Sequence, residues 1–114
     1  MSRETLPEAV VQILEAMSSL IDGGGDVLAA QARVARVTSF SPTYIDVDVP
    51  DDCPTGPWPD GPLPLSPTVV GDRGEVIGSL LIWIAGGRIS LLEQPWYTEE
   101  PPTSWPSLER VQWE

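Results

Sequence analysis

Residues 75–93, with the sequence EVIGSLLIWIAGGRISLLE, form the longest apolar run of the chain and contain a turn of their own. Segments rich in Ile, Leu and Trp flank Gly86 and Gly87. A Gly-Gly pair suits a type I′ turn, because both central residues of that turn have positive φ. The stretch therefore predicts a β-hairpin whose strands cover residues 75–85 and 88–93.

The two-residue turn also predicts which side chains of the hairpin share a face, because turn length fixes the register of the two strands. With Ala85 opposite Arg88, one face is expected to hold five apolar side chains: Leu80, Ile82, Ile84, Ile89 and Leu91. The other face is expected to hold Leu81, Trp83 and Leu92, together with Ser79, Ser90 and Arg88. Since both faces carry large apolar side chains, we expect each to be covered by a helix, by the C-terminal tail or by another protein.

Upstream of the hairpin, the N-terminal segment has the pattern of an amphipathic helix over residues 6–21. Apolar residues recur at helical intervals along one stripe: Val10, Ile13, Leu14, Met17 and Ile21. Thr5 and Glu8 have the spacing of a capping box, and the glycines at 23–25 are expected to end the helix. In a chain of this size we expect the stripe to dock on the sheet rather than on a partner.

Further strands are predicted on either side of a long loop. Residues 27–38 combine alanines with an alternation of apolar and polar side chains, and we interpret them as a strand with a bulge near Val34. Residues 43–49 alternate cleanly, with Ile45, Val47 and Val49 on one side and Tyr44, Asp46 and Asp48 on the other. A short strand over residues 68–71 is expected to pair with the start of the central hairpin.

Two proline-rich segments complete the chain. Residues 50–67 contain seven prolines and two glycines, which predicts an extended loop without regular structure. The tail, residues 94–114, is also rich in proline and carries four large aromatic side chains: Trp96, Tyr97, Trp105 and Trp113. Because such side chains are unfavourable in water, we expect much of the tail to lie as a strap across the second face of the hairpin.

Together these segments predict a single α+β domain over residues 1–114. One N-terminal helix packs on an antiparallel sheet of about four to five strands, with the proline-rich loop and the C-terminal strap around it. A chain of 114 residues can bury a core without disulfides or metals. No segment has the pattern of a membrane span or a signal peptide, so we expect a cytoplasmic protein without membrane association.

The charge balance restricts the partners of this protein. Seventeen acidic residues against six basic ones give a formal net charge of −11. Such a surface repels phosphate groups, which disfavours binding to nucleic acid or anionic lipid, and it attracts basic proteins. In a second interpretation, the acidic residues only keep a small protein soluble. The chain has no histidine, which excludes histidine-based catalytic triads.

Neither a nucleophile nor a metal site is predicted. Cys53, the only cysteine, follows two aspartates whose charge disfavours the reactive thiolate, so we expect it to be inert. Asp46, Asp48, Asp51 and Asp52 offer oxygen ligands, but their spacing does not match an EF-hand loop. We therefore expect an acidic edge that faces a partner, with no cofactor and no metal.

Two C-terminal motifs resemble a known group of sequences. Residues 87–93, GRISLLE, followed by WYTEEPP at 96–102 and by Trp105-Pro106, are similar to the C-terminal part of a group of short acidic proteins from high-GC bacteria. The resemblance covers about a quarter of the chain and implies a compact α+β domain. In charge and architecture the chain is also similar to immunity proteins of bacterial toxin systems, which implies a toxin as the basic partner.

These observations favour a non-enzymatic interaction protein that binds a basic protein, in the manner of an immunity protein. The residues expected to contact the partner are Tyr44, Asp46, Asp48, Asp51, Asp52, Trp58, Asp60 and Trp96. One alternative is a small-molecule binding domain or enzyme whose pocket is lined by Trp83, Trp58 and Tyr97. Another is a homodimer formed through the second face of the hairpin.

Overall fold

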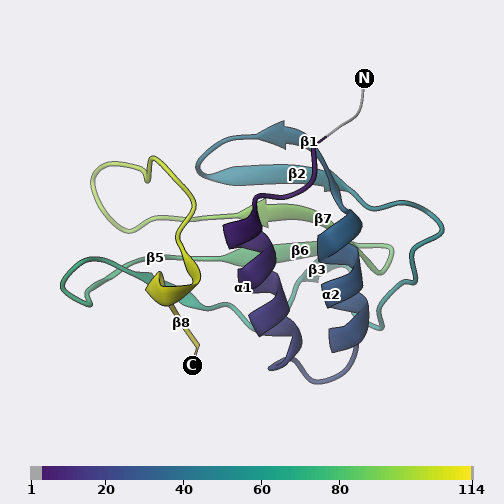
Figure 1. Cartoon of the computed structure of the whole chain (residues 1–114). Coiled ribbons are helices and arrows are strands. Elements are labelled where there is room, and N and C mark those ends of the chain that lie inside the picture. The colour runs from purple at the N-terminus through teal and green to yellow at the C-terminus, as the bar shows by residue number, and fades with distance from the viewer. Residues whose placement is uncertain (1–3, 114) are drawn as a thin grey trace.

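The computed structural model describes residues 4–113 and has an α+β fold (Figure 1). Within this range the elements are α1 (Glu8–Ser18), α2 (Gly25–Val34), β1 (Arg36–Phe40), β2 (Tyr44–Asp48), β3 (Gly61–Pro62), β4 (Thr68–Val70), β5 (Val76–Ser79), β6 (Leu81–Ala85), β7 (Arg88–Glu93), the 3₁₀ helix η1 (Leu108–Arg110) and β8 (Val111–Gln112). The strands form two antiparallel sheets, one ordered β1-β2-β7-β6-β3 and the other β5-β4-β8. Both α-helices lie on the same face of the five-stranded sheet (Figure 1).

Helix α1 follows from the predicted apolar stripe, but both of its ends differ from the predicted range of residues 6–21: it covers Glu8–Ser18, and its C-cap is Ser19 rather than a glycine. Its N-cap is Pro7, whose carbonyl accepts from the amides of Val10 and Val11, and no side chain caps it. The predicted capping box is therefore wrong: Thr5 instead forms an isolated antiparallel bridge with Arg36, at the start of β1. A proline before the first turn is compatible with a helix start, because the amide that it lacks has no partner inside a helix.

The prediction of a strand over residues 27–38 is wrong for residues 27–34, which belong to helix α2, and is confirmed only for residues 36–38, which belong to β1. Leu28, Gln31 and Ala32 are the buried residues of α2, and they stand at the intervals of a helix face. The helical preference of the alanines outweighs the apolar–polar alternation on which the strand was based. Residues 4–113 therefore contain two α-helices where one was expected, and the second helix places a buried glutamine against the sheet.

The predicted strand 75–85 is divided at Leu80 between the two sheets. β5 pairs with β4, whereas β6 pairs with β7 and with the short strand β3. Between β5 and β6, the amide of Leu80 donates to the carbonyl of Pro67 at 3.0 Å. The local sequence marks this switch only by Gly78 and Ser79, which interrupt the strand-forming residues just before it. β3 itself lies inside the proline-rich loop, for which no regular structure was expected.

The Gly-Gly turn has the predicted backbone, with φ of 61° at Gly86 and 75° at Gly87, but the register beyond it differs. Ile84 pairs with Ile89 as expected, whereas Trp83 pairs with Leu91 and Ile82 with Leu92. Ser90 is therefore an extra residue in β7, and this bulge reverses the faces of the residues that follow it. Leu92, at 1% exposure, is in the core, and Leu91 lies on the opposite face with Trp83.

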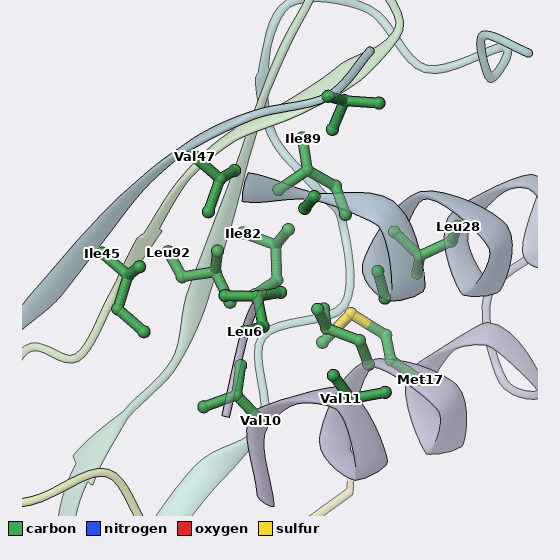
Figure 2. Close-up of a cluster of buried hydrophobic side chains, with 14 of the residues drawn as sticks. Leu6, Val10, Val11, Met17, Leu28, Ile45, Val47, Ile82, Ile89 and Leu92 are labelled. Atoms are coloured by element: carbon green, nitrogen blue, oxygen red, sulfur yellow. The ribbon is translucent and has the colours of Figure 1, made fainter. Parts of the chain in front are cut away.

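The main core lies between the helices and the five-stranded sheet (Figure 2). The helix side and the N-terminal segment contribute Leu6, Val10, Val11, Met17 and Leu28; the sheet contributes Ile45, Val47, Ile82, Ile89 and Leu92. A smaller cluster of Ile13, Val69, Leu80 and Val111 joins α1 to the three-stranded sheet. The arrangement explains why every second residue of β2 is buried.

The C-terminal tail is attached to both sheets. β8 pairs with β4, and Trp105 donates from its indole Nε1 to the carbonyl of Ser41 at 2.8 Å. Trp105 and Trp113 pack against both core clusters, which contain residues of α1. These two tryptophans are therefore beside the core, whereas we expected them on the second face of the hairpin.

Candidate functional site

The face of the five-stranded sheet opposite the helices carries the predicted partner residues of β2. Ile45 and Val47 point into the core, with 0% and 9% exposure. Because side chains alternate along a strand, Tyr44, Asp46 and Asp48 lie on the other face. We call this the outer face.

The neighbouring strands place apolar and acidic side chains beside those of β2. Asp46 is opposite Leu91, and Leu91 is opposite Trp83, so that one row crosses three strands. In the next row Tyr44 is opposite Glu93. The indole Nε1 of Trp83 donates to Oε1 of Glu93 at 3.0 Å, which fixes the orientation of this carboxylate. The outer face therefore combines aromatic rings and carboxylates with the apolar side chain of Leu91.

A groove of about 430 Å³ opens at the end of the outer face nearest the tail. Its lining residues are Thr43, Tyr44, Asp46, Leu91, Glu93, Gln94 and Trp96, which include two large aromatic side chains, two carboxylates and no basic group. Tyr44 is 46% exposed and Trp96 43% exposed. Asp46 and Glu93 are half-buried. We call this site the Tyr44–Trp96 groove.

Gln94 holds the rim of the Tyr44–Trp96 groove in place. Its side chain is 3% exposed, and its Nε2 donates to the carbonyls of Pro42 at 2.8 Å and Ser104 at 3.2 Å. Its backbone amide donates to the carbonyl of Thr43 at 2.7 Å. One buried amide therefore links the β1–β2 turn to the tail, two segments that are far apart in sequence.

Backbone pairing with β5 positions Trp96. Gly78 and Trp96 form an antiparallel bridge, and the amide of Tyr97 donates to the carbonyl of Ile77 at 2.9 Å. A Cβ atom at Gly78 would lie 2.5 Å from the carbonyl oxygen of Pro95, so only glycine permits this close approach. Trp96 is therefore held at the groove by ordered backbone even though its side chain is exposed.

The remaining acidic residues of the prediction continue from this face along the chain. Asp48 is opposite Arg36 on the edge strand β1. Asp51 and Asp52 are exposed in the turn after β2, and Nη2 of Arg88 donates to the carbonyl of Asp51 at 3.0 Å. Basic residues are thus close to this end of β2, whereas Ser39 is opposite Asp46.

Trp58 and Asp60 lie away from the Tyr44–Trp96 groove and have structural contacts. The ring of Trp58 packs beside Gly24 and Gly56, and its Nε1 donates to the carbonyl of Gly23 at 3.3 Å. Oδ1 of Asp60 accepts from the amide of Gly86 at 2.9 Å. The structure therefore brings together Tyr44, Asp46 and Trp96 from the predicted set and places Trp58 and Asp60 elsewhere.

The contact of Asp60 leads to a testable distinction between a structural and a partner-binding role. Asp60→Ala is expected to lower the free energy of unfolding by about 1 kcal/mol, since it removes the acceptor of the Gly86 amide at an exposed turn. Asp60→Asn keeps that acceptor and is expected to retain most of the stability. Urea denaturation of the three proteins measures the difference. Equal stability of all three would contradict a structural role for this carboxylate.

Sequence reasoning missed Glu93, Leu91 and Gln94 as groove residues. The expected register placed Leu91 on the core face and Glu93 opposite Leu80, so their neighbours on β2 were not apparent. The one available signal was the serine at position 90, a small polar residue that interrupts the apolar run of the strand.

The residues of the expected small-molecule pocket do not meet. Trp58 packs against the main core, on the helix side of the sheet, whereas Trp83 is on the outer face. Tyr97 is 62% exposed. Among residues 4–113, no three or more cysteine, aspartate or glutamate side chains are arranged to hold a metal ion. Neither α-helix in this range has the length and apolar character that a membrane span requires.

No protein-family model, curated protein or solved structure matches this chain. The features of the molecule that bear on its function are therefore the Tyr44–Trp96 groove and the charge of the chain.

Proposed function

We propose that this protein is a non-enzymatic interaction module that binds a basic protein through the outer face of its five-stranded sheet. One observation carries the proposal: Tyr44 and Trp96 border the same groove as the carboxylates of Asp46 and Glu93. Exposed aromatic side chains are common anchors of protein interfaces, and half-buried carboxylates beside them select a basic partner.

The charge of the whole chain supports the same proposal. A formal net charge of −11 attracts a basic protein over distances longer than any contact and speeds its encounter. The acidic groove is then the site at which the basic protein docks. The tail takes part in the proposed interface, because it supplies Trp96. A toxin neutralised by this chain is the partner that the resemblance to immunity proteins implies, and the single cysteine agrees with action in the reducing cytoplasm.

The first test identifies the partner and measures its binding. The immobilised full chain is mixed with lysate from cells that naturally encode it, bound proteins are identified by mass spectrometry, and the purified partner is titrated by calorimetry. We expect a basic protein whose affinity decreases as salt concentration rises, because salt screens the attraction between opposite charges.

Matched variants then locate the interface. Asp46→Asn with Glu93→Gln is expected to weaken binding by about tenfold or more, since two carboxylates at the interface lose their charge. Glu99→Gln with Glu100→Gln removes the same charge from the exposed tail outside the groove and is expected to change affinity by less than about twofold. Recovery of only acidic proteins, or equal loss in both double variants, would contradict the proposal.

A further inference from the structure

The Tyr44–Trp96 groove has the chemical character of a site for an organic cation. The faces of aromatic rings attract cations, and tryptophan does so most strongly. The same groove contains Asp46 and Glu93, which add full negative charge, and Leu91, which offers apolar surface to an alkyl chain. No neutral or anionic ligand uses all of these features together.

The negative charge of the groove is not neutralised within the described chain. No basic side chain lines the groove, and among residues 4–113 none is paired with Asp46. The residue opposite Asp46 on β1 is Ser39, and its neighbour on β7 is Leu91. Glu93 accepts from the indole of Trp83 through Oε1, a contact with a neutral donor that orients the carboxylate and leaves its charge in place.

The side chains that line the groove favour guanidinium over ammonium. A guanidinium ion is planar, stacks on aromatic rings and loses its weakly held water more readily than an ammonium ion does. It can also donate to two carboxylates from one plane. Tyr44 and Trp96 supply the rings, and Asp46 and Glu93 supply acceptors from adjacent strands.

We infer that the Tyr44–Trp96 groove receives the side chain of an arginine from the basic partner. This inference rests on the proposed function and assigns its central contact. The arginine inserts its alkyl chain along Leu91, its guanidinium stacks on the exposed rings, and its N–H groups donate to Asp46 and Glu93. The partner is thereby a protein that presents an arginine on a protruding loop or terminus.

The test uses a defined probe, so that it does not require the partner. Blocked arginine, N-acetyl-arginine methylamide, is titrated into the full chain labelled with ¹⁵N, and two-dimensional NMR follows the amide and indole signals. We expect saturable shifts at Tyr44, Leu91, Glu93 and the Trp96 indole, with a Kd on the order of 1–10 mM. The Trp105 indole, which donates to Ser41, is expected not to shift.

Two chemical controls test whether the groove recognises the guanidinium group or only its positive charge. The citrulline analogue has nearly the same shape without the charge and is expected to bind at least about tenfold more weakly. The lysine analogue keeps the charge without the planar group and is expected to bind at least about threefold more weakly. Equal or tighter binding of the lysine analogue, or shifts spread over all acidic segments, would overturn the assignment.

Protein variants provide the matched controls. Trp96→Ala and Tyr44→Ala are each expected to weaken arginine binding about threefold. Tyr97→Ala removes a neighbouring exposed aromatic side chain outside the groove and is expected to leave the affinity unchanged. Each variant is accepted only if its amide spectrum away from the groove matches that of the parent protein. Unchanged arginine affinity in both groove variants would also overturn the inference.

The outcome for the probe and the outcome for the partner can be distinguished. If a basic partner binds the parent chain and not the Asp46→Asn/Glu93→Gln variant, while blocked arginine causes no localised shift, the interaction function holds and the arginine site is wrong. If blocked arginine binds in the groove and no basic protein is recovered from lysate, the site holds and the proposed partner class is wrong.

Discussion

Replacing Gln31 by methionine is expected to lower the free energy of unfolding by about 3–5 kcal/mol. The side chain of Gln31 is fully buried, and its amide makes three hydrogen bonds to the backbone of other segments. Its Nε2 donates to the carbonyls of Pro54 and Gly87, each at 2.9 Å, and its Oε1 accepts from the amide of Ile89 at 2.9 Å.

Methionine fills nearly the same volume but satisfies none of these backbone groups. Each buried polar group left without a partner costs about 1–3 kcal/mol, and the buried amide of Ile89 loses its acceptor in this variant. The carbonyls of Pro54 and Gly87 each lose one donor, although the Gly87 carbonyl still accepts from the amide of Gly56 at 2.8 Å. The decrease in the free energy of unfolding is measured by urea denaturation monitored through tryptophan fluorescence. Gln12→Met is the matched control, because Gln12 is exposed on α1 and the same change there is expected to alter stability by less than about 0.5 kcal/mol.

A second variant separates hydrogen bonding from packing. Gln31→Glu retains an acceptor for the amide of Ile89 but offers no donor to the two carbonyls and places a charge in the interior. It is expected to destabilise at least as much as methionine does. A loss below about 1 kcal/mol for both variants would mean that these backbone groups find other partners, and would refute the role assigned to Gln31.

The position of Gln31 illustrates why part of the fold could be predicted and part could not. The Gly-Gly turn and the alternation in β2 are local patterns, and both are present in the structure. The partners of Gln31 at Gly87 and Ile89 are 56 and 58 residues away, and no local pattern specifies such contacts. Its helix was itself predicted as a strand, because the alternation of apolar residues was weighted above the alanines.

The candidate site was predictable to a similar extent. Tyr44, Asp46 and Trp96 were expected to contact a partner, and they line one groove. Glu93 was not expected there because the bulge at Ser90 shifts the register by one residue, and a bulge has no distinctive local sequence. Trp58 and Asp60 were expected there on grounds of residue type, which does not tell whether a side chain faces a partner or another loop.

Gly25→Ala is expected to lower the free energy of unfolding by about 2–3 kcal/mol, against the usual preference of helices for alanine. Gly25 is the first residue of α2, and alanine is ordinarily favoured over glycine in a helix by up to about 1 kcal/mol. Here a Cβ atom would lie 2.1 Å from the carbonyl oxygen of Ser18, at the end of α1. That atom belongs to the backbone of a packed helix, so relief requires α2 to move.

Gly71→Ala is the matched control, because the three atoms nearest to the added Cβ all belong to the carboxyl end of the flexible Glu75 side chain. It is expected to change stability by less than about 1 kcal/mol, as measured in the same urea experiment. A stabilising effect of Gly25→Ala would show that α1 and α2 tolerate a wider separation than the structure has.

Displacement of α2 by this substitution has a second consequence, because α2 also carries Gln31 to the hairpin turn. If the helix moves as a unit, the bond from the Ile89 amide to Gln31 lengthens, and hydrogen exchange of that amide becomes faster. Gly25→Ala and Gln31→Met then partly remove the same interaction. The double variant is therefore expected to lose less free energy of unfolding than the sum of the losses of the two single variants. Strict additivity would mean that the contact between the helices and the contact of Gln31 with β7 are independent. In that case the position of α2 would be fixed by its apolar face alone.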